Sequence, residues 1–378
     1  MIYFDNASTS WPKPEAVIAA ISDALRTSSS LGRGSGDGAA ASMDIVYDLR
    51  ESAAKFFGAP GAENVILTMN ATHALNIVIK GMMKNGGKAL ISGYEHNAVM
   101  RPLYALRENG AEVIRAEAGL FDNEAFLGSF ARELQKKPRL AIINCVSNVF
   151  GWILPFREAA LLAKEAGVPV LLDASQAAGH IPVGFSPGVE FIAAAGHKGL
   201  YGPGGTGLLI TRGNIPLSTL MEGGTGFDSR AMTMPPDPPE RFEAGTINIP
   251  GAAGLAAGIT FVNGIGLRRI REHESILVKR AHDGLCLLPG VRTFACRIPS
   301  RQSGVLSFAV KGRSPEEFGE LLSGKGIATR SGLHCAPEAH DSAGNPEGSV
   351  RLSFSVFNRK EEVDEFLEVT ESLLSDAL

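Results

Sequence analysis

Short apolar runs alternate with helix-forming stretches through the first two-thirds of this 378-residue chain. A short apolar run bounded by polar, glycine or proline residues is typical of a strand that is buried on both faces. Strands that alternate with helices predict an α/β fold, in which helices cover both faces of a mostly parallel, doubly wound sheet. We expect strands at residues 64–67, 88–92, 112–114, 140–144, 169–173, 189–194 and 207–210, and helices at 15–25, 42–57, 157–166 and one ending near 83.

After residue 250 this alternation is lost. A helix of small residues begins near Gly251 and is predicted to continue past Gly264 and Gly266 to Leu287, as a connector. Strands at 304–310, 327–329 and 350–354 and helices at 315–322 and 360–374 predict a smaller α+β domain. A chain of this length suits one large and one smaller domain. We therefore predict a large domain over residues 1–255 and a small C-terminal domain over 256–378.

The composition argues against several classes of protein. Apolar residues make up 44% and charged residues 20% of the chain, which is ordinary for a soluble globular protein. The net charge of −4 gives no basis for binding nucleic acid or an anionic membrane, and no apolar run approaches the ~20 residues of a membrane helix. Four widely spaced cysteines without a C-x-x-C pair argue against a disulfide framework or a metal site. The N-terminus has no signal-peptide pattern, so we expect a cytoplasmic protein.

A lysine follows one of the buried runs. Residues 189–194 lead into Gly196-His197-Lys198 and a glycine-rich turn. An ammonium group at the end of a buried strand is costly unless it is neutralised, and a covalent bond to a cofactor aldehyde neutralises it. Taken alone, the stretch equally fits a surface lysine in a turn. Asp173, at the end of the preceding strand, favours the cofactor, because pyridoxal phosphate needs a lysine for its aldehyde and an acid beside its ring nitrogen.

Five patterns together carry a family resemblance. They are Asp173-x-x-Gln176, Gly196-His197-Lys198, Tyr201-Gly202-Pro203, the segment 241–246 (Arg-Phe-Glu-Ala-Gly-Thr) and the segment 330–336 (Arg-Ser-Gly-Leu-His-Cys-Ala). In this order the chain resembles, over nearly its whole length, the class V, fold-type I pyridoxal-phosphate enzymes and, among them, the cysteine desulfurases and selenocysteine lyases. The resemblance implies pyridoxal 5'-phosphate as cofactor and L-cysteine or L-selenocysteine as substrate.

The resemblance also implies a cofactor site. Its residues are Ala71, Thr72, His73, His96, Asn148, Asp173, Gln176, His197, Lys198 and Thr246. Lys198 would bind the aldehyde and Asp173 the ring nitrogen. His96 would stack on the ring, and Asn148 would reach the ring hydroxyl and the substrate. Thr246 would bond the phosphate of a partner's cofactor, which implies a homodimer with two shared active sites.

Two of these assignments have plainer alternatives. Backbone N–H groups at a helix start favour an anion, so residues 71–73 would bind the phosphate, but the same stretch fits ordinary N-capping by Asn70 or Thr72. In the family an acidic residue often stands at the position of His73. His96 equally fits a cap of the helix that follows it. Arg33, in a Ser- and Gly-rich loop, is a further site candidate.

Arg330 and Cys335 follow a predicted strand and are expected to share a short exposed loop. An arginine binds a carboxylate bidentately, and a thiolate is a strong nucleophile. We expect Arg330 and His334 to raise the thiolate fraction of Cys335. The resemblance implies that Arg330 holds the substrate carboxylate, that Lys198 removes the Cα proton, and that Cys335 takes the substrate sulfur as a persulfide and leaves alanine. Cys145, inside an apolar run, is predicted to be a core residue.

The sequence departs from the desulfurase pattern at three positions. Ala195 stands where many desulfurases have a phosphate-binding serine, Leu333 replaces a common histidine, and Pro337 closely follows the cysteine. These differences leave open a selenocysteine lyase, or another class V reaction in which Cys335 is accessory. A non-catalytic protein that only keeps the fold is a third alternative, against which the intact Lys198 argues. The sequence does not specify a sulfur-acceptor partner, whether an iron–sulfur scaffold, a thiolation carrier or a free thiol.

Overall fold

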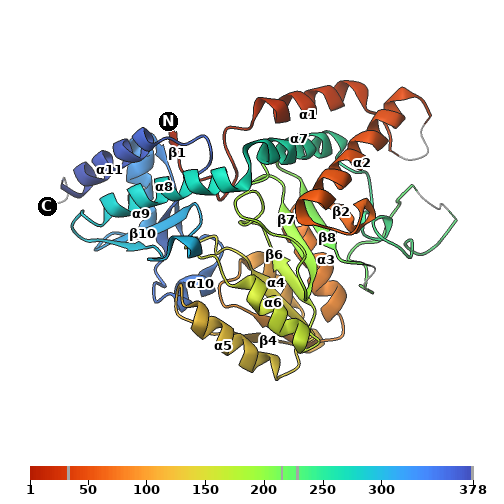
Figure 1. Ribbon diagram of the computed structural model, residues 1–378, viewed down its shortest axis with the longest axis horizontal. Helices are drawn as coiled ribbons and strands as arrows, with labels where there is room; N and C mark the ends of the chain where they lie inside the picture. The colour runs from red at the N-terminus through yellow and green to blue at the C-terminus, as the bar shows by residue number, and fades with distance from the viewer. Residues whose placement is uncertain (32–34, 214–215, 227–229, 376–378) are drawn as a thin grey trace.

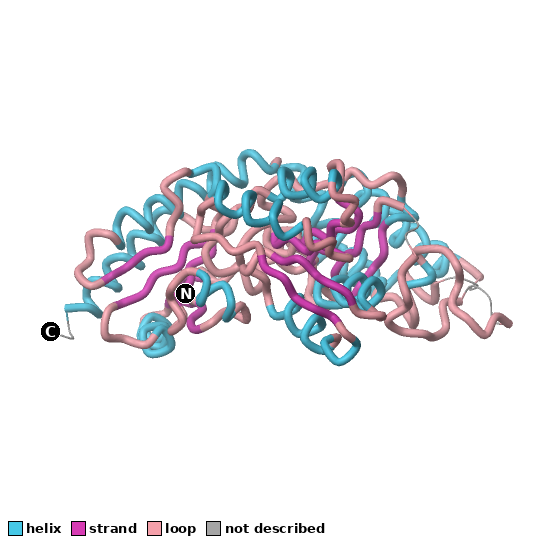
Figure 2. The backbone as a smooth tube through the Cα atoms, turned by 90° about the horizontal axis from the view of Figure 1, so that it is seen from below, coloured by secondary structure: helices cyan, strands magenta, loops and turns pink. Residues whose placement is uncertain are grey.

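The computed structural model describes residues 1–31, 35–213, 216–226 and 230–375. The candidate residue Arg33 lies outside the described residues. Figure 1 shows two regions, one with helices packed around a central sheet and one with a smaller sheet and its own helices. Seen from below, the strands form two separate groups along the length of the molecule (Figure 2).

The central sheet has seven strands, as the apolar runs predict. They are β2 (Val65–Thr68), β3 (Gly87–Ile91), β4 (Ala111–Arg115), β5 (Leu140–Asn144), β6 (Val170–Asp173), β7 (Val189–Ala195) and β8 (Gly207–Thr211), in the spatial order β2-β8-β7-β6-β5-β3-β4. β8 runs antiparallel to both of its neighbours, and the other pairings are parallel. The α/β fold with a mostly parallel sheet is therefore confirmed. The carboxyl ends of the parallel strands lie at one edge, where such sheets hold their ligands.

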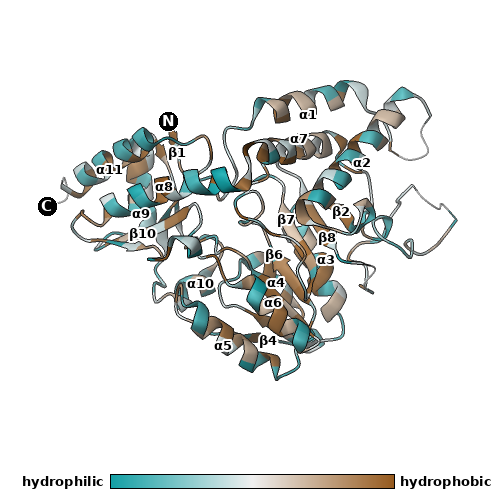
Figure 3. Cartoon of the chain, in the orientation of Figure 1, coloured by the Kyte–Doolittle hydropathy of each residue, from teal (hydrophilic) through white to brown (hydrophobic). Residues whose placement is uncertain are grey.

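Helices cover both faces of the sheet because successive strand residues point to opposite sides. One face carries α2 (Asp37–Phe57), α5 (Asn123–Leu134), α6 (Phe156–Glu165) and α7 (Ile249–Ile265), and the other carries α3 (Ala71–Met83) and α4 (Asn97–Ala105). Each face has its own apolar core: the first core lies under α2, α5, α6 and α7, and the second under α3 and α4. In β7, Ile192 and Ala194 point into the first core, whereas Phe191 and Ala193 point into the second. Cys145 is fully buried in the first core, as predicted. The strands of this sheet are accordingly among the most hydrophobic elements in Figure 3.

The second region is built on a four-stranded antiparallel sheet. Its elements are β9 (Val291–Phe294), β10 (Val305–Val310), β12 (Arg330–Gly332), β13 (Ser349–Ser353), α8 (Leu267–Leu285), α9 (Pro315–Gly324), α10 (Pro337–Ser342) and α11 (Lys360–Ser375). α8, α9 and α11 enclose a separate apolar core against β10 and β13. The first strand of the chain, β1 (Ile2–Tyr3), pairs with β11 (Ile327–Ala328), so the N-terminal segment lies against this second region. The division into domains at residue 255 stays a prediction.

The connector that we predicted as one helix is instead two helices. α7 ends at Ile265, Gly266 has a φ of 86°, and α8 begins at Leu267 with its axis turned by 79°. Glycine adopts that left-handed conformation without steric cost, so the chain turns there. α7 packs on α1 (Glu15–Thr27) and α2. Among the described residues no single helix has the length and apolar composition to cross a membrane, and α7 with α8 meets these criteria only as the bent pair.

Four short 3-10 helices complete the described elements. They are η1 (Ala62–Asn64), η2 (Arg107–Asn109), η3 (Glu240–Phe242) and η4 (Pro299–Arg301). η3 ends the long irregular segment before residue 243, part of which lies outside the described residues.

Candidate active site

A cavity of about 220 Å³ opens where β5, β6 and β7 end. Most of the side chains predicted for cofactor and substrate line it: Ala71, Thr72, His96, Asn148, Asp173, Gln176, His197, Lys198, Arg330 and Cys335. Arg330 comes from β12 of the second sheet and Cys335 from the loop after it, whereas Lys198 follows β7 of the central sheet. The cavity is therefore formed by both regions of the molecule.

His73 and Thr246 do not line this cavity. Both line a neighbouring cavity of about 230 Å³. The His73 ring turns back to its own helix start, where Nδ1 lies 3.4 Å from the backbone N of Met69. Burial lowers the pKa of His73, so its imidazole is neutral at pH 7. A single chain thus gives no geometric support for His73 as a phosphate ligand, whereas Thr246 was expected to act at a partner's site.

The start of α3 is capped by Asn70, one of the alternatives that the sequence left open. Its Oδ1 accepts a hydrogen bond from the backbone N of His73 at 2.9 Å. Ala71 and Thr72 nevertheless line the cavity. The capped helix start therefore still faces the cavity with its positive end.

Lys198 and Asp173 face the cavity from neighbouring strand ends, because β6 and β7 pair in parallel with Asp173 opposite Ala193. Burial lowers the pKa of Lys198 to about 8, against the opposing effect of the Asp173 carboxylate. The amine is therefore closer to its neutral, reactive form than a solvated lysine is. Asp173 is held by Ser175, whose backbone N and Oγ donate to Oδ1 at 2.9 and 2.5 Å. The strand ends thus place a fixed carboxylate and a reactive amine in one cavity.

His96 forms the helix cap that the sequence allowed, and its stacking on a cofactor ring stays a prediction. Its Nδ1 accepts a hydrogen bond from the backbone N of Ala98 at 3.0 Å, so the ring caps α4 while it lines the cavity. Burial, followed by the charge of Lys198, lowers the pKa of His96 to about 4, so the ring is neutral. The sequence analysis missed the preceding residue, Glu95, which is buried and accepts hydrogen bonds from both N and Oγ of Ser92. These bonds fix the turn that carries His96.

Cys335 is exposed, as predicted, but the residues on either side of it, His334 and Ala336, are buried. Arg330 lies within a strand and not on the loop, and His334 is only 3% exposed. Burial holds the pKa of His334 well below its usual value, so this neutral ring brings no positive charge to the thiol, contrary to our expectation. Arg330 does bring one, because its Nη2 lies 3.5 Å from Sγ of Cys335.

The backbone around Cys335 is strained and held in place. His334 and Cys335 have φ values of 51° and 57°, a left-handed conformation that costs a residue with a side chain about 1–2 kcal/mol. Asn148 Nδ2 donates to the His334 carbonyl at 2.8 Å, and the backbone N of Asn97 donates to the Cys335 carbonyl at 2.7 Å. Both donors belong to the central-sheet region. Contacts between the two regions therefore hold the cysteine at the cavity.

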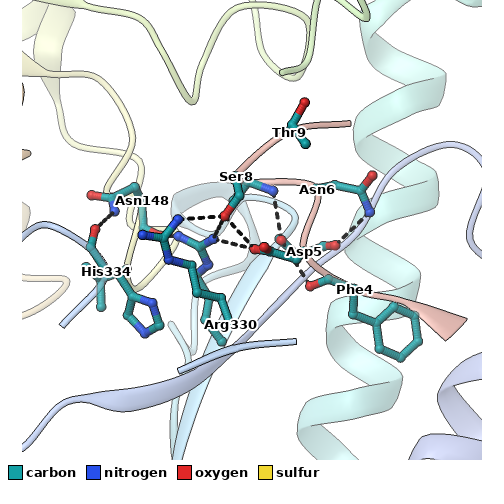
Figure 4. A network of polar contacts seen from close by, with 12 residues as sticks. Phe4, Asp5, Asn6, Ser8, Thr9, Asn148, Arg330 and His334 are labelled. Atoms are coloured by element: carbon teal, nitrogen blue, oxygen red, sulfur yellow. Dashed lines mark hydrogen bonds and ion pairs between the residues drawn. The ribbon is translucent and has the colours of Figure 1, made fainter. Parts of the chain in front are cut away.

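Three residues beside the cavity were missed by the sequence analysis: Asp5, Ser8 and Arg351. Arg351 lies in β13, and its Nη2 donates to Asp5 Oδ1 at 2.8 Å and to Ser8 Oγ at 3.0 Å. Ser8 Oγ also accepts a hydrogen bond from Arg330 (Figure 4). For Arg351 the available signal was an arginine inside a predicted strand of mostly apolar residues, because a buried charge requires a partner.

A close backbone contact positions the turn that carries Lys198. Gly179 has a φ of 88°, and a Cβ at this residue would lie 1.9 Å from the carbonyl oxygen of Gly199. Gly179→Ala is expected to displace the lysine turn and to destabilise the protein by roughly 3 kcal/mol or more, since overpacking adds to about 1 kcal/mol of backbone strain. Gly110→Ala is the matched control, because Gly110 has a φ of 83° with no atom within 4 Å of the added Cβ. The thermal unfolding midpoint of each variant is compared with that of the wild type. Equal decreases for Gly179→Ala and Gly110→Ala would contradict the steric argument.

Comparisons with known proteins agree with this geometry. The aminotransferase class V family model matches residues 2–366. The chain belongs to this family. A probable cysteine desulfurase of Mycolicibacterium paratuberculosis is 32% identical over 97% of this chain, but the chain spans only 54% of that relative's length. A probable cysteine desulfurase of Methanothermobacter thermautotrophicus is 32% identical over 98% of this chain and 94% of its own length. The apo structure of a cysteine desulfurase from Thermococcus onnurineus NA1 superposes with a TM-score of 0.92 at 34% identity, covering 99% of this chain and 95% of that one.

Class V aminotransferases are pyridoxal-phosphate enzymes, and the cavity of this family member fits that cofactor. Lys198 supplies an amine of lowered pKa, and Asp173 supplies a fixed carboxylate. The Oδ1 of Asn148 is buried without a hydrogen-bond partner among the described residues, so an acceptor remains for a ligand hydroxyl. The neutral ring of His96 completes a wall against which a flat ligand can stack.

The lowered pKa of Lys198 predicts how cofactor-free protein takes up pyridoxal phosphate. The neutral amine is the form that reacts with an aldehyde, so the rate of covalent attachment should rise with pH and level off above about pH 8. A lysine with an ordinary pKa of 10.5 would give a rate that still rises at pH 10. Stopped-flow absorbance from pH 6.5 to 10 measures the profile. A midpoint above pH 9.5 would show that burial does not activate this lysine.

Proposed function

We propose that this protein is a pyridoxal-phosphate-dependent cysteine desulfurase, which converts L-cysteine to L-alanine and takes the sulfur onto Cys335 as a persulfide. The observation that carries the proposal is the position of Cys335. Its exposed Sγ lies beside Arg330 at the cavity that also holds Lys198 and Asp173. A thiol at this position supplies a nucleophile that can take sulfur from a substrate. Relatives at 31–34% identity that carry the name cysteine desulfurase support the same reaction.

The residues that would hold the cofactor line the cavity. Lys198 would bind it covalently, Asp173 would keep its ring nitrogen protonated, and His96 would stack against its ring. Ala71 and Thr72, at the start of α3, would hold its phosphate, with Asn148, Gln176 and His197 around the ring. When bound, pyridoxal phosphate supplies an electron-accepting ring that stabilises negative charge at the substrate Cα.

The side chains of this protein would carry out the remaining steps. Arg330 binds the substrate carboxylate, and the amine of Lys198, with a pKa of about 8, takes the Cα proton near neutral pH. The Cys335 thiolate then attacks the substrate Sγ. A sulfur–sulfur bond forms, the Cβ–Sγ bond breaks, and its electron pair stays with the substrate carbon skeleton. Protonation of the skeleton at Cβ and Cα yields alanine, and Cys335 keeps the added sulfur.

We further propose a homodimer in which Thr246 reaches the active site of the partner. Thr246 and His73 line a cavity next to the catalytic one, which supports a role at a boundary between two copies. The persulfide on Cys335 requires an acceptor, either a sulfur-carrier protein of the cytoplasm, such as an iron–sulfur assembly scaffold, or a small thiol.

The function is tested by incubating purified, cofactor-loaded protein with L-cysteine and a thiol reductant. Equal amounts of alanine and sulfide are expected, and L-selenocysteine in a parallel reaction tests the selenocysteine lyase alternative. Bound cofactor without alanine from L-cysteine would refute the desulfurase assignment. Alanine and selenide from L-selenocysteine alone would assign the lyase instead.

A further inference from the structure

A histidine with no part in the proposed reaction packs against the turn that carries Lys198. His180 lies in the turn that follows β6, and a Cβ added at Gly199 would lie 2.5 Å from both Cδ2 and Nε2 of its ring. The same Cβ would lie 2.4 Å from the carbonyl oxygen of Ala178. In a close-packed interior, contacts of this kind leave the backbone no room to shift toward its neighbours. The His180 ring is therefore part of the wall behind the residue that follows Lys198.

Another edge of the same ring is bound to the second region of the molecule. His180 Nδ1 lies 2.8 Å from Oε1 of Glu274, which belongs to α8. The two side chains are 14% and 2% exposed, so the pair is largely shielded from water. A Cβ added at Gly304 would lie 2.7 Å from Glu274 Oε2, so the segment before β10 encloses the carboxylate as well. Glu274 therefore has little freedom to turn away from the ring.

The pair is held by charge as well as by the hydrogen bond. Burial and the charge of Lys198 oppose the protonated form of His180, but the Glu274 carboxylate outweighs both and raises the pKa of the ring. A hydrogen bond between charged groups is roughly twice as strong as one between neutral groups. We therefore expect Glu274 to keep the ring in one position against the lysine turn.

The lysine turn is also held at its far end. The backbone N of Tyr201 donates to the Lys198 carbonyl at 2.8 Å, and Tyr201 Oη accepts a hydrogen bond from the backbone N of Val356 in the second region at 3.3 Å. The second region thus reaches the turn through Tyr201 and, at Gly199, through His180. A displacement of about 1 Å at a reacting group can cost about a hundredfold in rate, so contacts that fix this turn bear directly on the lysine amine.

We propose that His180 and Glu274 are positioning residues for Lys198. Glu274 on α8 holds the imidazole ring, and the ring holds the turn that presents the lysine amine to the cavity. The proposal deepens the proposed function, since it rests on Lys198 as the lysine that binds the cofactor. It does not depend on the amino acid that is turned over.

The test measures how fast cofactor-free protein attaches pyridoxal phosphate, by stopped-flow absorbance at a temperature at which every variant is folded. His180→Ala and Glu274→Ala are each expected to lower the limiting rate by about tenfold. The cofactor concentration at half the limiting rate should not change, because the start of α3 is untouched. The double variant should be no slower than either single variant, since residues that act as one unit have non-additive effects.

The pH of the measurement separates position from charge. At pH 9 the Lys198 amine, with a pKa of about 8, is mostly neutral in the wild type. A misplaced amine should still react slowly there. If the variants were slow at pH 7.5 but equal to the wild type at pH 9, only the pKa of Lys198 would have changed, and the proposal would be wrong.

His273→Ala is the matched control. His273 precedes Glu274 on α8, and its Nε2 lies 2.9 Å from the carbonyl oxygen of Asn358, within the second region. This variant also loses a histidine hydrogen bond, so its thermal unfolding midpoint should fall, but its attachment rate should equal that of the wild type. Equal slowing by His273→Ala would indicate general support of the fold and would overturn the proposal.

The remaining outcomes are equally decisive. A folded His180→Ala or Glu274→Ala protein with the wild-type limiting rate would overturn the proposal. If the alanine variants do not fold, Glu274→Gln decides, because it keeps the shape and an acceptor but removes the charge. It should slow attachment by about threefold or more, and the wild-type rate would overturn the proposal. The expected attachment rates without alanine production from L-cysteine would refute only the desulfurase assignment.

Discussion

Cys335→Ala should abolish sulfur release from L-cysteine, by roughly a thousandfold or more, while the protein remains folded and loaded with cofactor. The reason is that the proposed acceptor of the substrate sulfur is removed, whereas the groups around Lys198 and Asp173 are untouched. Alanine and sulfide are measured together over time, and the cofactor absorbance confirms that the site is occupied.

Cys286→Ala is the matched control for this experiment. Cys286 is also an exposed cysteine, and its sulfur lies 3.6 Å from a nitrogen of His282 near the end of α8, away from the residues that line the cavity. This variant should keep full activity. Unchanged sulfide production by Cys335→Ala would reduce Cys335 to an accessory role and would favour a different class V reaction.

Lys198→Ala should eliminate turnover altogether, by roughly ten-thousandfold or more, and should also prevent covalent attachment of the cofactor. The variant removes both the proposed attachment point and the proposed base for the Cα proton. Lys198→Arg tests whether a positive charge at this position is sufficient. Arginine keeps the charge, but it neither bonds to the aldehyde nor gives up its proton. Both variants are expected to fail. Reduction with borohydride, followed by mass spectrometry, shows whether the cofactor is attached. Attachment at another lysine would contradict the assignment.

The backbone around Cys335 is held in a strained conformation at the cavity. The left-handed backbone at His334 and Cys335 persists because Asn148 and the backbone of Asn97 bond the two carbonyls. Strain that surrounding contacts maintain in this way is typical of functional sites. In the proposed reaction the thiol is already held at the cavity, so it would lose little conformational entropy before it attacks.

Local sequence patterns were sufficient to predict the strands of the central sheet and the residues that follow their ends. Buried strands show as apolar runs, and a parallel sheet places the residues after its strands at one edge. Lys198 and Asp173 could therefore be assigned to one site from their positions alone. The break at Gly266 was missed because helix-forming residues continue on both sides of it, in Ile249–Ile265 and in Leu267–Leu285.

The sequence by itself determined the α/β fold and the strand ends that carry Lys198 and Asp173, and it singled out the cysteine on which the proposed reaction depends. Only the tertiary structure decided which residues surround them. Asp5 and Arg351 are 346 residues apart and pair because the segment after β1 lies beside β13, where Asp5 forms a bridge with Ser353. The neutrality of His334 likewise depends on burial by distant segments. Such contacts and burial arise between segments that no local pattern connects, so the charge of the site became clear only in the folded chain.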